Sequence, residues 1–145
     1  MLPVITGTVY QNVYFEYSSK GTYAPFITEV KILPDRTIKY KRTHLYPEYV
    51  HEEWTGGISE NDYNTFIDEI MNRCDFMNLP SKADHKNLTK DSSTDEFSIK
   101  YGDKKHSIGG YDAVHYKQYQ QVYESYRKIM KSAINKKYIV VPHKR

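Results

Sequence analysis

Few residues of this chain have the types and spacing that catalysis or metal binding requires. The only cysteine, Cys74, falls on the apolar stripe of an expected helix, whereas a nucleophilic cysteine needs exposure and a neighbouring base. The six histidines are scattered singly, and none has the spacing that places two imidazoles on one metal ion. The sequence therefore predicts a protein that is not an enzyme and that binds no metal or cofactor. An enzyme of unrecognised type is the remaining alternative.

The stretch from His44 to Gly57 has no hydrophobic periodicity and is rich in Tyr, Glu and His, so we expect a long exposed loop. Exposed rings lower solubility, and Tyr and Trp are enriched at the centres of protein interfaces. Either this loop folds back over the core or it binds another protein. In the second case the candidate partner-binding residues are Tyr46, Tyr49, Glu52, Glu53 and Trp54.

Basic residues alternate with tyrosines in two other stretches, a pattern that single-stranded nucleic acid can use. Lysines hold phosphates, and aromatic rings stack on bases. Lysines on an exposed strand also keep a sheet edge soluble, which is the simpler explanation. A nucleic-acid-binding module is therefore an alternative function, and its candidate residues are Lys39, Lys41, Arg42, Arg127, Lys128 and Lys131.

Length and composition favour one domain, residues 1–145. A chain of 145 residues with 39% hydrophobic residues can bury a real core, and one cysteine cannot form an internal disulfide. The 15 tyrosines outnumber five phenylalanines and one tryptophan, so we expect tyrosine to replace Leu and Phe in much of the core. No apolar run approaches the roughly 20 residues that span a bilayer. We therefore expect no membrane partner and a cytoplasmic location, or the envelope if a signal peptide precedes this sequence.

Hydrophobic periodicity predicts an α+β fold. We expect a strand at 9–17, a hairpin over 26–45 that turns at Pro34 and Asp35, and a second hairpin over 96–108. Helices are expected from Ser59 to Leu79, because Pro80 forbids extension, and over about 113–135, while 138–141 is a candidate edge strand. Residues 81–95 are expected to be a mobile connection. The result is an antiparallel sheet of about five to six strands with two helices packed on one face.

The net charge of +3 conceals an asymmetry along the chain. Residues 48–70 hold seven acids and no Lys or Arg, whereas residues 115–145, with a basic end at 136–145, hold eight bases and one acid. Acids early in one helix and bases late in the other match the helix dipoles. The alternatives are that the two segments face different partners, or that two copies associate through patches of opposite charge.

Five short segments have the same layout along the chain as in a known group of domains. They are Pro34-Asp35, Gly56-Gly57-Ile58-Ser59, the run from Phe76 to Pro80, the run from Asp91 to Ile99, and Lys105-His106. Over about residues 10–134 the chain resembles small bacterial α+β domains found in envelope lipoproteins and the emfourin-type inhibitors of metalloproteases. The resemblance implies binding or inhibition of another protein and carries over no active-site residue. We therefore expect a non-enzymatic interaction domain of bacterial or phage origin, inhibitory or immunity-type, that occupies a partner's surface.

Overall fold

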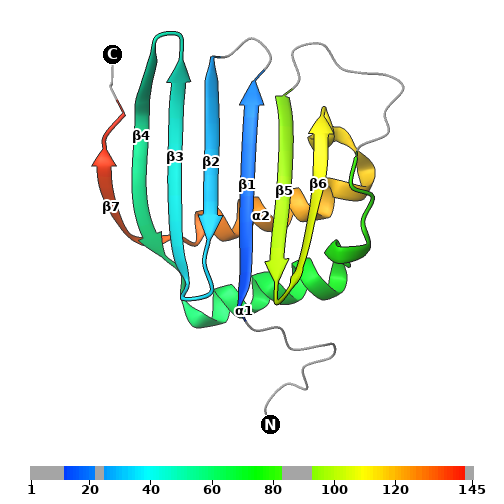
Figure 1. Ribbon diagram of the computed structural model, residues 1–145. Helices are drawn as coiled ribbons and strands as arrows, with labels where there is room; N and C mark the ends of the chain where they lie inside the picture. The colour runs from blue at the N-terminus through cyan, green and yellow to red at the C-terminus, as the bar shows by residue number, and fades with distance from the viewer. Residues whose placement is uncertain (1–11, 22–24, 83–92, 143–145) are drawn as a thin grey trace.

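The computed structural model describes residues 12–21, 25–82 and 93–142, and these residues form one sheet with two helices on one of its faces (Figure 1). Seven strands of the described chain pair antiparallel in the order β6-β5-β1-β2-β3-β4-β7. The α+β class, the antiparallel sheet and the two helices are confirmed. The expected five to six strands become seven, because residues assigned to a loop form a strand.

The helices and strands account for most of the described chain. The strands are β1 (Val13–Gly21), β2 (Phe26–Ile32), β3 (Thr37–Leu45), β4 (Glu48–Gly57), β5 (Ser93–Tyr101), β6 (Lys104–Tyr111) and β7 (Ile134–Val140). The helices are α1 (Glu60–Asp68), which continues as a π-helical turn (Glu69–Arg73), and α2 (Gln120–Lys131). Short 3₁₀ turns lie at Phe76–Asn78, Ala113–His115 and Lys117–Tyr119. No helix in the described ranges is long and apolar enough to cross a membrane.

Local sequence signals determine several elements where they were expected. The β2–β3 hairpin turns at Pro34 and Asp35, where the Asp35 carboxylate accepts a hydrogen bond of 3.0 Å from the Thr37 amide. α1 begins after Ser59, whose hydroxyl accepts a hydrogen bond of 3.1 Å from the Asp62 amide. The second hairpin, β5–β6, is also confirmed.

The prediction of an exposed loop over residues 44–57 is wrong. Residues 48–57 are β4, which pairs with β3 and leaves Tyr46 and Pro47 as the hairpin turn. The pairing of Arg42 with Glu52 and of Thr43 with Val50 leaves His51 as an extra residue on β4. A bulge of this kind shifts the alternation of side chains by one residue, and it therefore hides the period-two pattern of a strand.

The second helix is shorter than expected. It starts at Gln120 rather than near residue 113, because Asp112 has a positive φ of 61° and Tyr116 is extended. It ends at Lys131, and residues 134–140 form β7 instead of a last helical turn. Of the connection expected at 81–95, residues 93–95 belong to β5, and residues 83–92 lie outside the described residues. Residues 9–11 of the first expected strand and 143–145 of the basic end lie outside them too.

The core lies between the helices and one face of the sheet, which we call the inner face. Phe15 of β1 meets Phe66 of α1 edge-on at 5.1 Å between ring centroids and Tyr126 of α2 at 6.1 Å. Tyr17, Tyr119 and Tyr126 are buried, so tyrosine does fill part of the core. Figure 1 shows α2 crossing behind the strands and α1 along their lower ends. The opposite face, which we call the outer face, carries mostly charged and small polar residues and has no described element packed on it.

Candidate functional site

Exposed apolar side chains gather at one edge of the sheet. Of seven large apolar residues that are exposed in the described chain, six lie on the β3–β4 turn, the start of β4, β7, or the residue after β7. Figure 1 shows that β4 and β7 form one side of the sheet. We call this surface the apolar edge, and its members are Tyr46, Tyr49, Ile134, Tyr138, Ile139 and Val141. Exposed apolar side chains that lie along one side of a protein are candidates for an interaction site.

The upper part of the apolar edge is held in place by stacked rings. The His44 ring stacks on Tyr49 with centroids 4.8 Å apart, and its Nδ1 donates a hydrogen bond of 2.8 Å to the Pro47 carbonyl oxygen. Phe26 of β2 packs edge-on against His44 at 5.0 Å and against His51 at 5.3 Å. A hairpin tip that is already ordered loses less conformational entropy when it binds.

The lower part of the apolar edge is the last strand of the sheet. β7 pairs with β4 on one side, and no described strand pairs with its other side. Such a strand presents free backbone N–H and C=O groups, which can accept an additional strand. Tyr138 lies on the inner face and Ile139 on the outer face, so an added strand would find apolar contacts on both sides.

The structure divides the predicted partner-binding residues into two groups. Tyr46 is 79% exposed and Tyr49 is 44% exposed, so both are available to a partner. Trp54, in contrast, is only 4% exposed, and its ring stacks on Tyr40 with centroids 5.3 Å apart beneath the Lys136 ammonium. The prediction that Trp54 lies in an exposed loop is wrong, because the pairing of β4 with β3 turns this side chain into the core.

The two predicted acids lie opposite basic residues. Glu52 faces Arg42 and Glu53 faces Lys41 across the β3–β4 ladder, and both acids are half-buried. Sequence reasoning missed the apolar residues of β7 as binding residues, although a signal for them exists in the apolar run at 138–141 that follows two lysines. That run predicts an edge strand, and only its place in the sheet makes it a candidate binding surface.

The basic residues of the nucleic-acid alternative do not form one surface. Lys39 and Lys41 lie on the outer face of β3. Arg42 lies on the inner face, where its guanidinium is 4.3 Å from the centre of the Phe26 ring. The other three, Arg127, Lys128 and Lys131, belong to α2, which covers the inner face. No single stretch of nucleic acid can contact both sets through one flat face of this sheet.

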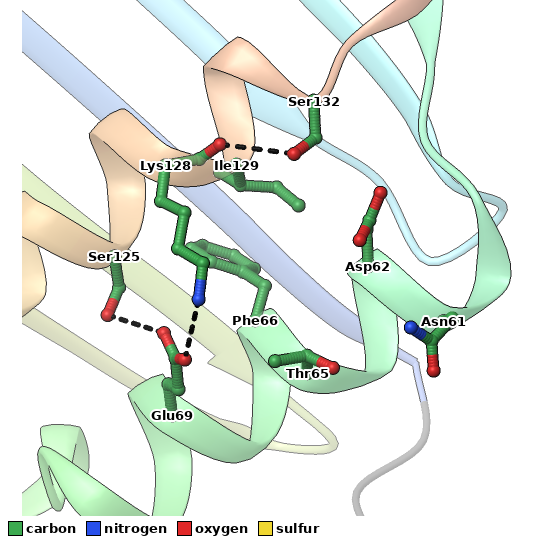
Figure 2. Close-up of a pocket in the computed structure, with 9 residues that line it drawn as sticks. All are labelled: Asn61, Asp62, Thr65, Phe66, Glu69, Ser125, Lys128, Ile129 and Ser132. Carbon is green, nitrogen blue, oxygen red and sulfur yellow. Dashed lines mark hydrogen bonds and ion pairs between the residues drawn. The ribbon is translucent and has the colours of Figure 1, made fainter.

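A hollow of about 250 Å³ separates α1 from α2, as Figure 2 shows. Both Ser125 and Lys128 point from α2 toward Glu69, whose carboxylate accepts a hydrogen bond of 2.9 Å from Ser125 and pairs with the Lys128 ammonium at 3.4 Å. Ser132 donates a hydrogen bond of 3.2 Å to the Lys128 carbonyl oxygen. The contacts of Ser125 and Lys128 with Glu69 hold α2 to the π-helical turn that follows α1, across this hollow.

Two buried carboxylates elsewhere are also used by the fold. Asp95 accepts hydrogen bonds of 2.6 Å from Tyr17 and 2.5 Å from Ser93. Burial, followed by the charge of Asp95, raises the pKa of Tyr17 well above its usual value. Asp112 is 2% exposed and accepts a hydrogen bond of 2.5 Å from Nδ1 of His115. No Ser, Thr or Cys side chain of the described residues is hydrogen-bonded to that imidazole, so a nucleophile–base pair is not assembled there.

Metal ligands and the cysteine give no stronger candidate. Residues 12–21, 25–82 and 93–142 contain no group of three or more His, Cys, Asp or Glu side chains placed to hold one metal ion. Cys74 is buried at the end of the π-helical turn, as its place on the apolar stripe predicted. Burial, with a smaller contribution from Glu69, raises the pKa of its thiol to about 11.

We expect Cys74 to react slowly while the protein is folded. With a thiol pKa of about 11, only about one thiol in a thousand is ionised at pH 8, and the thiolate is the reactive form. Alkylation by iodoacetamide, followed by mass spectrometry, should be about 100-fold or more slower in buffer than in urea. Equal rates in the two solvents would show that this thiol is exposed and activated.

Comparisons with known proteins add no assignment. No model of a known protein family matches this chain, and no curated protein matches it either. The resemblance to emfourin-type inhibitors therefore stays a prediction, and the apolar edge is the surface on which a functional proposal can rest.

Proposed function

We propose that this protein is a non-catalytic interaction domain of inhibitory or immunity type, which covers part of another protein with its apolar edge. The observation that carries the proposal is the concentration of six of the seven exposed large apolar side chains of the described chain on this edge. A partner that covers these side chains removes their apolar surface from water, which stabilises the complex by about 25 cal/mol for each Å² buried. Tyr46, Tyr49 and Tyr138 supply rings of the type that dominates binding energy at interfaces.

The partner that fits this edge is an extended segment that is both apolar and acidic. An added strand would pair with the free side of β7, with its apolar side chains against Tyr138 and Ile139. Lys136 and Lys137 are exposed on the same strand, so carboxylates in the added segment would find opposite charges. A second copy fits less well, because antiparallel pairing of two β7 strands about their central residue sets the two Lys137 side chains opposite each other.

The proposal is tested by affinity capture from the source organism with three tagged proteins. These are the unmodified chain, the double variant Tyr138→Ser/Ile139→Ser, and the matched control Tyr14→Ser. Tyr14 is 46% exposed and Tyr138 is 49% exposed, but Tyr14 lies on the outer face of β1, away from the edge. We expect one protein to be recovered with the unmodified chain and the control, and to be reduced about tenfold or more with the double variant.

The readouts separate this interaction from the alternatives. Binding of the recovered partner should slow hydrogen exchange at the amides of β7, as an added strand requires. Equal recovery with all three proteins would overturn the proposal. Sedimentation that shows a dimer of the unmodified chain and a monomer of the double variant would also overturn it, because the edge would then be occupied by a second copy.

A further inference from the structure

Four of the exposed lysines on the outer face lie near one end of the sheet, and the proposed protein interaction does not use them. They lie on either side of β1, two on β5 and β6 and two on β2 and β3. All four lie next to the β2–β3 and β5–β6 turns, at the opposite end of the strands from the β3–β4 turn. We call this set the lysine row, and its members are Lys31, Lys39, Lys100 and Lys105.

The lysine row places like charges opposite each other on neighbouring strands, where opposite charges would stabilise the sheet. Lys31 pairs directly with Lys39, and Lys100 pairs directly with Lys105, so like charges face each other twice. Such pairs destabilise a sheet. None of the four forms an ion pair with a described residue. Glu16 of β1 lies opposite Lys31, but Lys39, Lys100 and Lys105 have no acid directly opposite them in the described ladders. This excess of positive charge indicates that an anion outside the described residues neutralises it.

The neighbouring row on the same face shows the contrast. There Lys41 lies between Glu29 of β2 and Glu53 of β4, so opposite charges alternate across three strands. Charges on this face can therefore be arranged favourably, and the lysine row is a local departure from that arrangement. Lys41 also offers a matched control, because it is an exposed lysine of the same strand as Lys39.

A hollow with an exposed aromatic ring lies at one end of the lysine row. It has a volume of about 360 Å³ and is lined by Tyr14, Glu16, Ser98, Lys100 and Lys105. Tyr14 pairs with Lys100 across the β1–β5 ladder, so the ring and two ammonium groups lie on adjacent strands. Tyr14 is also the one exposed large apolar residue of the described chain that is not part of the apolar edge.

We propose that the lysine row and this hollow bind single-stranded nucleic acid. The lysines contact successive phosphates along about 19 Å, which is four inter-strand spacings of about 4.8 Å. The Tyr14 ring stacks on one base, and the Glu16 carboxylate accepts a hydrogen bond from an exocyclic amine such as that of cytosine. An acidic peptide would use the lysines but would have no use for a ring beside an acceptor, so the hollow favours a nucleic acid.

This inference goes beyond the proposed function, because it concerns the outer face and a different class of ligand. The nucleic-acid site proposed here differs from the one that the sequence suggests. The basic side chains of α2 lie on the other side of the sheet and cannot belong to it. Of the residues that the sequence suggests, it includes only Lys39. The two proposals fail independently, because Tyr14→Ser is the control for the apolar edge and a test variant here.

The test measures fluorescence anisotropy of labelled oligodeoxycytidine and oligothymidine of about 12 nucleotides, within the range of known single-strand sites. For the unmodified chain we expect saturable binding, tighter to oligodeoxycytidine, that weakens as salt rises from about 50 to 200 mM with a log–log slope of about −2 to −3. Lys100→Gln/Lys105→Gln should lose about tenfold or more in affinity and make the slope shallower by about 1.4. Tyr14→Ser should lose about fivefold or more with little change in slope.

Two control variants and one competitor test whether the oligonucleotide binds at the lysine row. Lys41→Gln, on the same face, and Lys128→Gln/Lys131→Gln, on α2, should bind within about twofold of the unmodified chain. Circular dichroism should show that every variant keeps its fold. The proposal is overturned if the unmodified chain does not bind, if the α2 variant rather than the lysine-row variant loses binding, or if polyglutamate displaces the oligonucleotide at equal charge concentration.

Discussion

Gly109→Ala is expected to lower the free energy of unfolding by about 3–5 kcal/mol, among the largest effects for any single substitution in this protein. A Cβ atom at position 109 would lie 2.1 Å from the Asp95 carbonyl oxygen and 2.9 Å from the Glu96 Cα atom. Both are backbone atoms of β5, which cannot retreat without losing its ladder to β6. Gly109 also has a φ of 137°, a conformation that other residues rarely adopt. Urea unfolding followed by circular dichroism measures the loss.

The neighbouring glycine supplies the control for that experiment. Gly110 has a similar φ of 132°, but a Cβ atom there would meet nothing within 4 Å. Gly110→Ala therefore bears only the backbone strain, about 1–3 kcal/mol, and should be clearly less destabilising than Gly109→Ala. Equal losses in the two variants would contradict the claim that the close approach of β5 and β6 requires glycine at position 109.

Trp54→Ala is the second substitution with a large expected effect, and it should lower the free energy of unfolding by about 3–5 kcal/mol. The indole fills the core beside Tyr40 and also lies 4.5 Å from the Lys136 ammonium, so its removal leaves a cavity and breaks a contact between β4 and β7. Thermal and urea unfolding measure the change. The loss should appear whether or not a partner is present, because the side chain is only 4% exposed.

Tyr46→Ala is the control that separates core from interface. Tyr46 is 79% exposed at the hairpin turn, so its removal should change stability by no more than about 0.5 kcal/mol while weakening capture of a protein partner. A Trp54→Ala protein that keeps its stability and loses only its partner would show that the indole is an interface residue after all.

The elements that could be predicted from the sequence are those with local causes. Ser59 caps α1 through a bond to an amide three residues later, and Pro34 with Asp35 sets the β2–β3 turn. β4 could not be predicted, because its extra residue, His51, interrupts the alternation and its neighbours are half-buried on both faces. Whether such residues form a strand depends on the pairing partner, which local periodicity does not contain.

The candidate site could be predicted only in part for a similar reason. Tyr46 and Tyr49 are predictable because their residue types are typical of interfaces, and both are exposed. Trp54 has the same type but the opposite environment, and only the register of β4 against β3 decides between them. The apolar residues of β7 become a surface because that strand closes one side of the sheet. The like-charged pairs of the lysine row likewise exist only through strand register.

The pairing of β1 with β5 can form only late in the synthesis of the chain. β1 lies near the middle of the finished sheet, yet its neighbour β5 is far from it along the chain, as the pair Tyr17 and Asp95 shows with a separation of 78 residues. A ribosome that has released β1–β4 has made a four-stranded meander whose first strand has nothing along one side. Until residues 93–101 emerge, a nascent chain can join its neighbours on the polysome through that side, so slow translation of the middle of the message would favour aggregation.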